Sequence, residues 1–73
     1  MRMIDEVGGQ VISTVKLSIW FTAPYETCIF YPNKDSEVVA VYDTEDEARA
    51  GHEALVDKSK RRLAVIISLL IEE

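Results

Sequence analysis

The sequence lacks most of the features that hold small proteins together without a large core. Its 73 residues include one cysteine and one histidine, so an internal disulfide is excluded. Neither residue belongs to a CxxC or HxxxH spacing, which argues against a structural zinc site. A glycine-rich phosphate loop is also missing, because Gly8-Gly9 is followed by neither a helix nor a lysine. We therefore expect neither a metal ion nor another cofactor.

Basic residues are scarce. Eight Lys and Arg stand against 13 Asp and Glu, which gives a net charge of −5. Sequence-independent binding to nucleic acid relies on a basic surface, so direct contact with DNA or RNA is disfavoured. An acidic chain can instead imitate nucleic acid in the basic groove of another protein, although acidity also serves solubility alone.

Long apolar runs are absent as well. The longest, residues 63–71, is far shorter than the ~20 residues of a membrane-spanning helix. Residues 1–6 contain no apolar run of the signal-peptide type. We therefore expect a cytoplasmic protein that does not contact a membrane.

Residues 1–73 are short for a stable core, and we expect a single domain. A chain of this size buries only about 60% of its unfolded surface, so its own core is marginally stable. With no disulfide or metal expected, association with further copies is the remaining way to add buried surface. Apolar residues make up 48% of the chain. We therefore expect a homo-oligomer, a dimer or larger.

Alternating apolar and polar residues predict a sheet within residues 10–42. Residues 10–21 form its first strand, and the more apolar row is expected to face a helix: Val11, Ser13, Val15, Leu17, Ile19 and Phe21. Trp20 lies on the other row, at a sheet edge or in an interface. Residues 25–31 and 37–42 form a hairpin around the turn at 32–36. Residues 1–9 are either one more short strand or a frayed terminus.

A helix is predicted over residues 44–71. Thr44 and Glu47 form a capping box, in which each side chain satisfies a backbone N–H of the first turn. The later apolar residues recur every three or four positions. An alternative ends the helix at the basic residues 58–62 and makes residues 65–67 a strand. The fold is thus α+β, with a three- to four-stranded antiparallel sheet packed by one long C-terminal helix.

His52 is the most informative polar residue of this helix. Gly51 beside it costs about 1 kcal/mol relative to alanine in a helix, which indicates a close backbone approach. We expect the strip Ala48-Gly51-His52-Leu55 to face the sheet, with Glu26 or Thr27 as the nearest polar strand residue. His52 is then a core residue bonded to Glu26 or a backbone carbonyl, or else it contacts a ligand.

Catalytic groups are not evident. Cys28 would need His52 as its base, and nothing in the spacing brings the two together. A buried, inert cysteine is the expectation. We therefore predict a non-enzymatic protein.

The apolar tail of the chain is the predicted oligomer interface. Residues 63–71 have apolar side chains in every direction around a helix, so one sheet cannot cover them all. We expect a two-fold dimer with this segment at its centre. The candidate interface residues are Trp20, Leu63, Ile66, Ile67 and Leu70.

Three segments of the sequence resemble a small family of phage and prophage proteins with an FETMVF-like strand and an RYxTxEEAxxGH-like helix. They are Ile12-Ser13-Thr14-Val15, Tyr25-Glu26-Thr27-Cys28-Ile29-Phe30, and Tyr42-Asp43-Thr44-Glu45-Asp46-Glu47-Ala48 followed by Gly51-His52. The sequence departs from the family at Ile19-Trp20, where the family has an acidic–histidine pair, and at Val41, where it has arginine.

This family has no established activity, so the resemblance implies a context, the cytoplasm of a phage-infected host cell. There, the expected role is to antagonise host defence by sequestering a small nucleotide-type signal or by binding a defence protein. The candidate ligand-binding residues are Tyr25, Glu26, Thr27, Tyr42, Arg49 and His52. The alternative is a structural or assembly accessory protein whose role is homo-oligomerisation.

Overall fold

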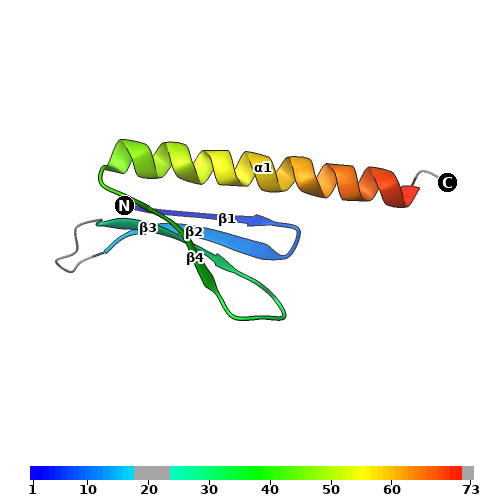
Figure 1. Cartoon of the computed structure of the whole chain (residues 1–73), viewed down its shortest axis with the longest axis horizontal. Helices are drawn as coiled ribbons and strands as arrows, with labels where there is room; N and C mark the ends of the chain where they lie inside the picture. The colour runs from blue at the N-terminus through cyan, green and yellow to red at the C-terminus, as the bar shows by residue number, and fades with distance from the viewer. Residues whose placement is uncertain (18–23, 72–73) are drawn as a thin grey trace.

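The computed structural model describes residues 1–17 and 24–71, and it has the predicted α+β architecture. One four-stranded antiparallel sheet packs against one long C-terminal helix (Figure 1). The elements are β1 (Arg2–Val7), β2 (Gln10–Lys16), β3 (Tyr25–Phe30), β4 (Glu37–Tyr42) and α1 (Glu45–Ile71).

The sheet is a meander in which each strand pairs with the next, in the order β1-β2-β3-β4. Residues 2–7 form a strand that pairs with β2 from Arg2 opposite Val15 to Val7 opposite Gln10, so the frayed-terminus alternative is wrong. Gly8 and Gly9 join the two strands with φ values of 58° and 84°. Positive φ at both central residues is what a two-residue type I′ turn requires, and glycine adopts it without strain.

The predicted orientation of β2 is wrong. Its helix-facing residues are Ile12 and Thr14, which are fully buried, whereas the row expected there is only half-buried: Val11, Ser13 and Val15. Ile12 pairs with Ile29 of β3, and Thr14 pairs with Thr27. Directly opposite residues point to the same face, so the buried row of β3 determines that of β2. β2 ends at Lys16, one residue before Leu17 of the predicted strand. The rest of that predicted strand, residues 18–21 with Trp20, lies outside the described residues.

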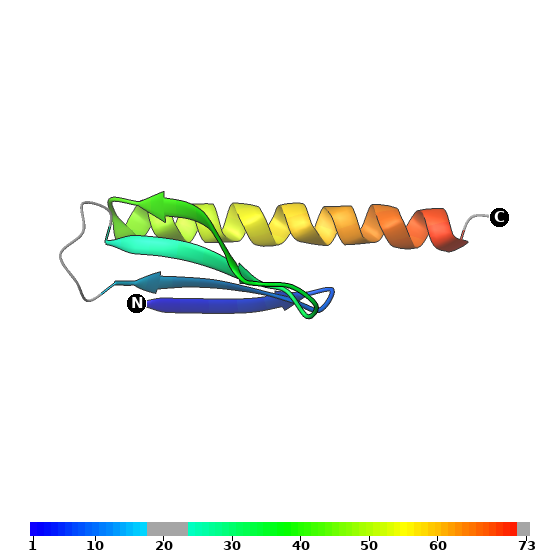
Figure 2. The same cartoon turned by 60° about the horizontal axis from the view of Figure 1, so that its bottom comes forward.

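The hydrophobic core lies between the sheet and the middle of α1. Figure 2 shows the helix running along the sheet. Val7, Ile12, Ile29 and Val56 form the buried cluster of the core. Partly buried side chains surround this cluster, namely those of Tyr31, Val39, Leu55 and Leu63. The core is therefore thin, as the chain length predicted.

The helix begins at the predicted cap. Thr44 Oγ1 accepts a hydrogen bond from the Glu47 backbone N–H at 3.2 Å. The Thr44 hydroxyl in turn donates to the Glu47 carboxylate at 2.9 Å, so that carboxylate binds the hydroxyl in place of the expected Thr44 N–H. From there α1 continues without a break to Ile71, and the alternative strand at residues 65–67 is wrong.

The last turns of α1 extend beyond the end of the sheet (Figure 1). Leu63 still packs against the core, but the large apolar side chains after it are between 45% and 75% exposed. They are Val65, Ile66, Ile67, Leu69, Leu70 and Ile71. The predicted oligomer interface at Leu63, Ile66, Ile67 and Leu70 stays a prediction, with the last three of these side chains open to solvent.

Candidate functional site

A chain of hydrogen bonds between polar side chains crosses the interface of helix and sheet. His52 of α1, Thr14 of β2 and Thr27 of β3 are its buried members, each with an exposed fraction of 0%. His52 Nδ1 lies 2.6 Å from Thr14 Oγ1, which lies 2.5 Å from Thr27 Oγ1. This geometry brings residues from three elements into direct contact at the centre of the protein.

Two further residues extend this chain toward the surface. His52 Nε2 lies 2.7 Å from Asp5 Oδ2 of β1, and the Thr27 hydroxyl donates to Tyr42 OH of β4 at 3.2 Å. Because a carboxylate only accepts, Nε2 must bear a proton and donate it to Asp5. We call Asp5, Thr14, Thr27, Tyr42 and His52 the polar chain. Within the described residues every buried side-chain nitrogen or oxygen has a partner.

The predicted hydrogen-bond partner of His52, Glu26 or a backbone carbonyl, is wrong, because its ring nitrogens bond to Thr14 and Asp5. Thr27 belongs to the polar chain, but Glu26 lies on the opposite face of β3, where it accepts from the Cys28 thiol at 3.5 Å. Sequence reasoning missed Asp5 and Thr14. The pairing of Thr14 with Thr27 was the available signal for the second, because two small β-branched hydroxyls opposite each other hydrogen-bond across strands.

Gly51 packs closely against a side chain of the sheet, in agreement with the predicted close approach. A Cβ at this position would overlap the ring of Tyr42. Ala48, one turn earlier, is fully buried, and His52 follows directly. The predicted strip of small residues therefore faces the sheet, and it allows the Tyr42 hydroxyl to reach Thr27.

The order Asp5–His52–Thr14 is that of an acid, a base and a hydroxyl nucleophile. A nucleophile must be reached by its substrate, however, and both Thr14 and His52 are completely buried. Only Asp5 is accessible, with 49% of its side chain exposed. The polar chain therefore joins helix to sheet and offers no accessible nucleophile.

The candidate ligand-binding residues do not line one pocket. Thr27, Tyr42 and His52 are joined in the polar chain. Tyr25 is buried near them in β3, whereas Glu26 lies on the other face of the sheet. Arg49 lies on the outer side of the helix, where its Nε contacts Glu45 Oε2 at 3.2 Å. Ligand binding by these residues stays a prediction.

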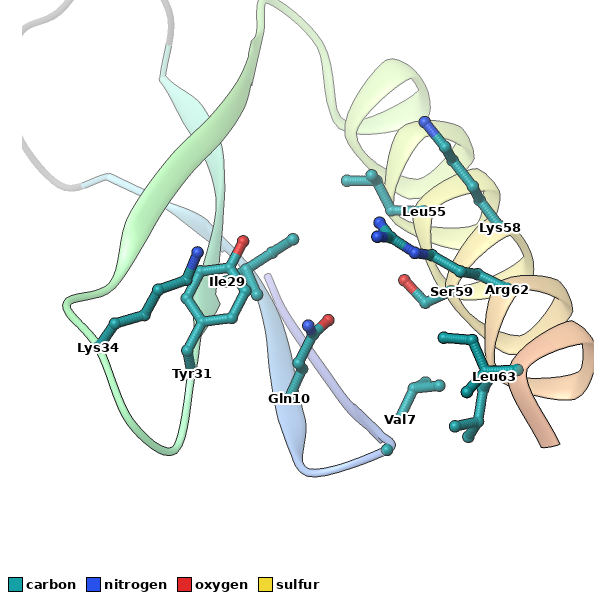
Figure 3. Close-up of a pocket in the computed structure, with 12 residues that line it drawn as sticks. Val7, Gln10, Ile29, Tyr31, Lys34, Leu55, Lys58, Ser59, Arg62 and Leu63 are labelled. Atoms are coloured by element: carbon teal, nitrogen blue, oxygen red, sulfur yellow. The ribbon is translucent and has the colours of Figure 1, made fainter. Parts of the chain in front are cut away.

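An open groove lies elsewhere, between the sheet and the C-terminal half of α1 (Figure 3). Its volume is about 500 Å³. Lys58 and Arg62 line it from the helix, and Lys34 lines it from the turn after β3. The remaining lining residues are Val7, Gly8, Gln10, Ile29, Tyr31, Leu55, Ser59, Leu63 and Ile66. We call this site the cationic groove.

The charge of the cationic groove is opposite to that of the whole chain. Three of the eight Lys and Arg line it, and none of its lining residues is Asp or Glu. Lys34 Nζ lies 4.1 Å from the centroid of the Tyr31 ring. In Figure 3 the side chain of Arg62 extends from the helix toward the sheet, across from Tyr31. The groove thus combines apolar walls, an aromatic ring and positive charge.

Cys28 is a poor nucleophile in this structure. Burial raises the pKa of its thiol, and the hydrogen bond to Glu26 and the negative charge of Glu26 raise that pKa further. The thiolate, which is the reactive form, is therefore disfavoured. Cys28 is half-buried and lies beside a carboxylate, where an apolar environment had been expected.

The described part of the chain has neither a metal-binding cluster nor a membrane-spanning helix. Residues 1–17 and 24–71 contain no group of three His, Cys, Asp or Glu side chains placed to hold a metal ion. The helix α1 does not combine the length and the hydropathy needed to cross a membrane. Comparisons with family models, curated proteins and solved structures give no match for this chain.

Proposed function

We propose that this protein is a non-enzymatic binding protein that holds a small nucleotide-type anion in the cationic groove. The observation that supports the proposal is the clustering of Lys34, Lys58 and Arg62 around a groove without carboxylates, in a chain of net charge −5. If charged residues were placed at random on an acidic surface, both acidic and basic side chains would line the groove. Positive charge concentrated in a concave site raises the local concentration of anions.

The shape and chemistry of the groove agree with a nucleotide. Its volume of about 500 Å³ lies within the usual range for small-molecule sites. Arg62 and Lys58 are one helical turn apart, and both side-chain types bind phosphate oxygens. Tyr31 supplies a ring on which a base can stack, provided that Lys34 moves off its face.

The biological role that follows is sequestration. A protein that binds a nucleotide-type signal without consuming it lowers the free concentration of that signal. Antagonism of host defence by this means is the role that the resemblance to phage proteins implies. A defence protein as the target would instead bind the acidic surface, and the groove would then bind no nucleotide.

Calorimetric titration tests this proposal with three probes: adenosine monophosphate, adenosine and inorganic phosphate. We expect adenosine monophosphate to bind more tightly than either fragment, because only it supplies both the ring and the charge. Its affinity should fall as salt is raised, because the cations lie in an open groove. Equal, weak binding of all three probes would contradict the proposal.

A second candidate is supported by a different observation. The exposed apolar end of α1 fits an assembly accessory protein whose role is homo-oligomerisation. An oligomer that binds none of the three probes would favour this role over nucleotide binding.

A further inference from the structure

The end of α1 presents a self-complementary stripe of apolar side chains. Ile66, Ile67 and Leu70 follow Leu63 at intervals of three, four and seven residues, which places all four on one side of the helix. Reversing the direction of the helix about a point between Ile66 and Ile67 exchanges Leu63 with Leu70 and Ile66 with Ile67. The stripe therefore maps onto itself, as an isologous two-fold interface requires. We call these four residues the tail stripe.

Nothing within the described chain covers this surface beyond Leu63. The helix extends past the sheet, and the sheet reaches only its first part (Figures 1 and 2). The six large apolar side chains of residues 65–71 are 45% to 75% exposed. Exposed apolar side chains gathered on one short segment usually mark an interaction surface.

The charges along α1 favour a two-fold interface at the tail stripe. No charged residue occurs between Arg62 and Glu72, so the tail stripe lacks the charges that usually mark a solvated helix face. The last turn of α1 also has no basic residue to offset the negative end of the helix dipole. In an antiparallel pair, Arg62 of one copy lies level with Ile71 of the other and supplies that positive charge.

We propose that a second copy of this chain packs antiparallel on the tail stripe and forms a two-fold dimer. Ile66, Ile67 and Leu70 of the tail stripe are 45%, 45% and 75% exposed, so each copy has apolar side chains that the other can bury. Leu63 and Ile66 line both the tail stripe and the cationic groove, so the partner's helix closes one end of that groove. The dimer does not depend on what the groove binds.

Sedimentation velocity of the full chain, from about 1 to about 50 micromolar, tests the dimer itself, because association depends on protein concentration. We expect a dimer that is lost, with at least a hundredfold weaker association, in the double variant Ile67→Asp and Leu70→Asp. Val38→Asp is the control, because Val38 is an apolar residue in β4 whose exposed fraction of 55% lies between those of Ile67 and Leu70. It should leave the dimer intact. A monomeric wild-type chain throughout this range overturns the proposal, whether or not the variants fold.

Disulfide trapping tests the antiparallel direction in a Cys28→Ser chain. Ile67→Cys lies beside the two-fold axis, so oxidation should link two copies. Leu70→Cys should not form this link, because residue 70 of one helix is about 10 Å along the axis from residue 70 of the other. Equal linking of both variants would indicate parallel helices and overturn this arrangement. Binding of a monomer to phosphatidylglycerol vesicles would show that lipid covers the tail stripe instead.

Discussion

His52 connects the helix to two strands of the sheet. Its two ring nitrogens reach Asp5 of β1 and Thr14 of β2, and Thr14 leads on to Thr27 and Tyr42. A core made of few apolar side chains is thus crossed by one polar chain in which every buried member is satisfied. Such networks specify a unique packing when complete and destabilise a protein when broken.

Replacement of Thr14 tests this role. Thr14→Val keeps the shape of the side chain but leaves His52 Nδ1 and the Thr27 hydroxyl without this partner. We expect the free energy of unfolding to fall by about 1–3 kcal/mol. Ser13→Ala, on the half-buried opposite face of the same strand, should change it by less than about 0.5 kcal/mol. Urea denaturation measures both, and equal effects would show that the polar chain adds nothing.

Gly51 and Tyr42 offer a test that separates packing from helix propensity. In the wild-type chain Gly51→Ala forces a Cβ into the Tyr42 ring, and overpacking should cost about 1–3 kcal/mol. In a Tyr42→Ala chain the same substitution meets no ring and should stabilise by up to about 1 kcal/mol through helix propensity. A double-mutant cycle in urea therefore predicts a change of sign. Additive effects would contradict the close contact.

Cys28 provides a test that depends on pH. Because the pKa of its thiol is raised in the folded chain, the unfolded chain releases this proton at lower pH. Folded stability should therefore fall as the pH rises through the ordinary range of thiol ionisation. At about pH 8, just below the ordinary pKa of a thiol, iodoacetamide should modify Cys28 several-fold more slowly in the folded chain than in denaturant.

The Glu26→Gln variant removes the negative charge beside the thiol while keeping an oxygen that accepts its hydrogen bond, and it should accelerate the reaction of the folded chain. Glu6→Gln, on a different strand, is the control and should leave the rate unchanged. A folded chain that reacts as fast as the denatured one would contradict the raised pKa.

Among the contacts of single side chains, some could be predicted from the sequence and others could not. The packing of Gly51 and His52 against the sheet follows from a glycine and a histidine at helical spacing among apolar residues. Thr14 and Asp5 could not be found in that way. Their role depends on strand register and on the pairing of β1, which are set by contacts distant in the sequence.

The elements of the fold follow largely from local signals. Thr44 and Glu47 mark the start of α1, and the absence of proline and glycine after Gly51 lets it continue to Ile71. Gly8-Gly9 provides the turn that pairs β1 with β2. The orientation of β2 was predicted wrongly, because a count of apolar residues favours its outer row over a buried row that contains a threonine.

The cap of α1 can be tested directly. Thr44→Ala leaves the Glu47 backbone N–H without its acceptor and should lower the free energy of unfolding by about 1 kcal/mol. Thr44→Ser keeps the hydroxyl and should be nearly neutral. Thermal denaturation followed by far-ultraviolet circular dichroism measures both variants. Equal melting temperatures would show that the cap is dispensable.

The whole molecule has two unequal halves along its helix. The first half of α1 covers the sheet and completes the polar chain, whereas the second half lines the cationic groove and then extends into solvent (Figure 1). The molecule measures 53 × 25 × 15 Å along its principal axes, an elongated shape for 73 residues. The polar chain therefore joins the first half of α1 to the sheet, and the surfaces proposed for binding and for dimerisation lie along the second half.

The cationic groove itself could not have been predicted from spacing. Lys34 and Arg62 are far apart in the sequence, and only the pairing of β3 with β4 and the straightness of α1 bring them to one site. The basic residues 58–62 were interpreted as a possible helix end, because lysine and arginine favour that position. In the structure they lie within an uninterrupted helix, and two of them face the groove.

The central claim is that the cationic groove binds a nucleotide-type anion, and one pair of variants tests it most directly. Arg62→Gln removes a charge that lines the groove, and Arg61→Gln removes the neighbouring charge that does not. Calorimetric titration with adenosine monophosphate should show about tenfold weaker binding for Arg62→Gln, equivalent to about 1.4 kcal/mol. Arg61→Gln should bind as the wild type does. Equal affinities of the two variants, or no binding by the wild-type chain, would contradict the claim.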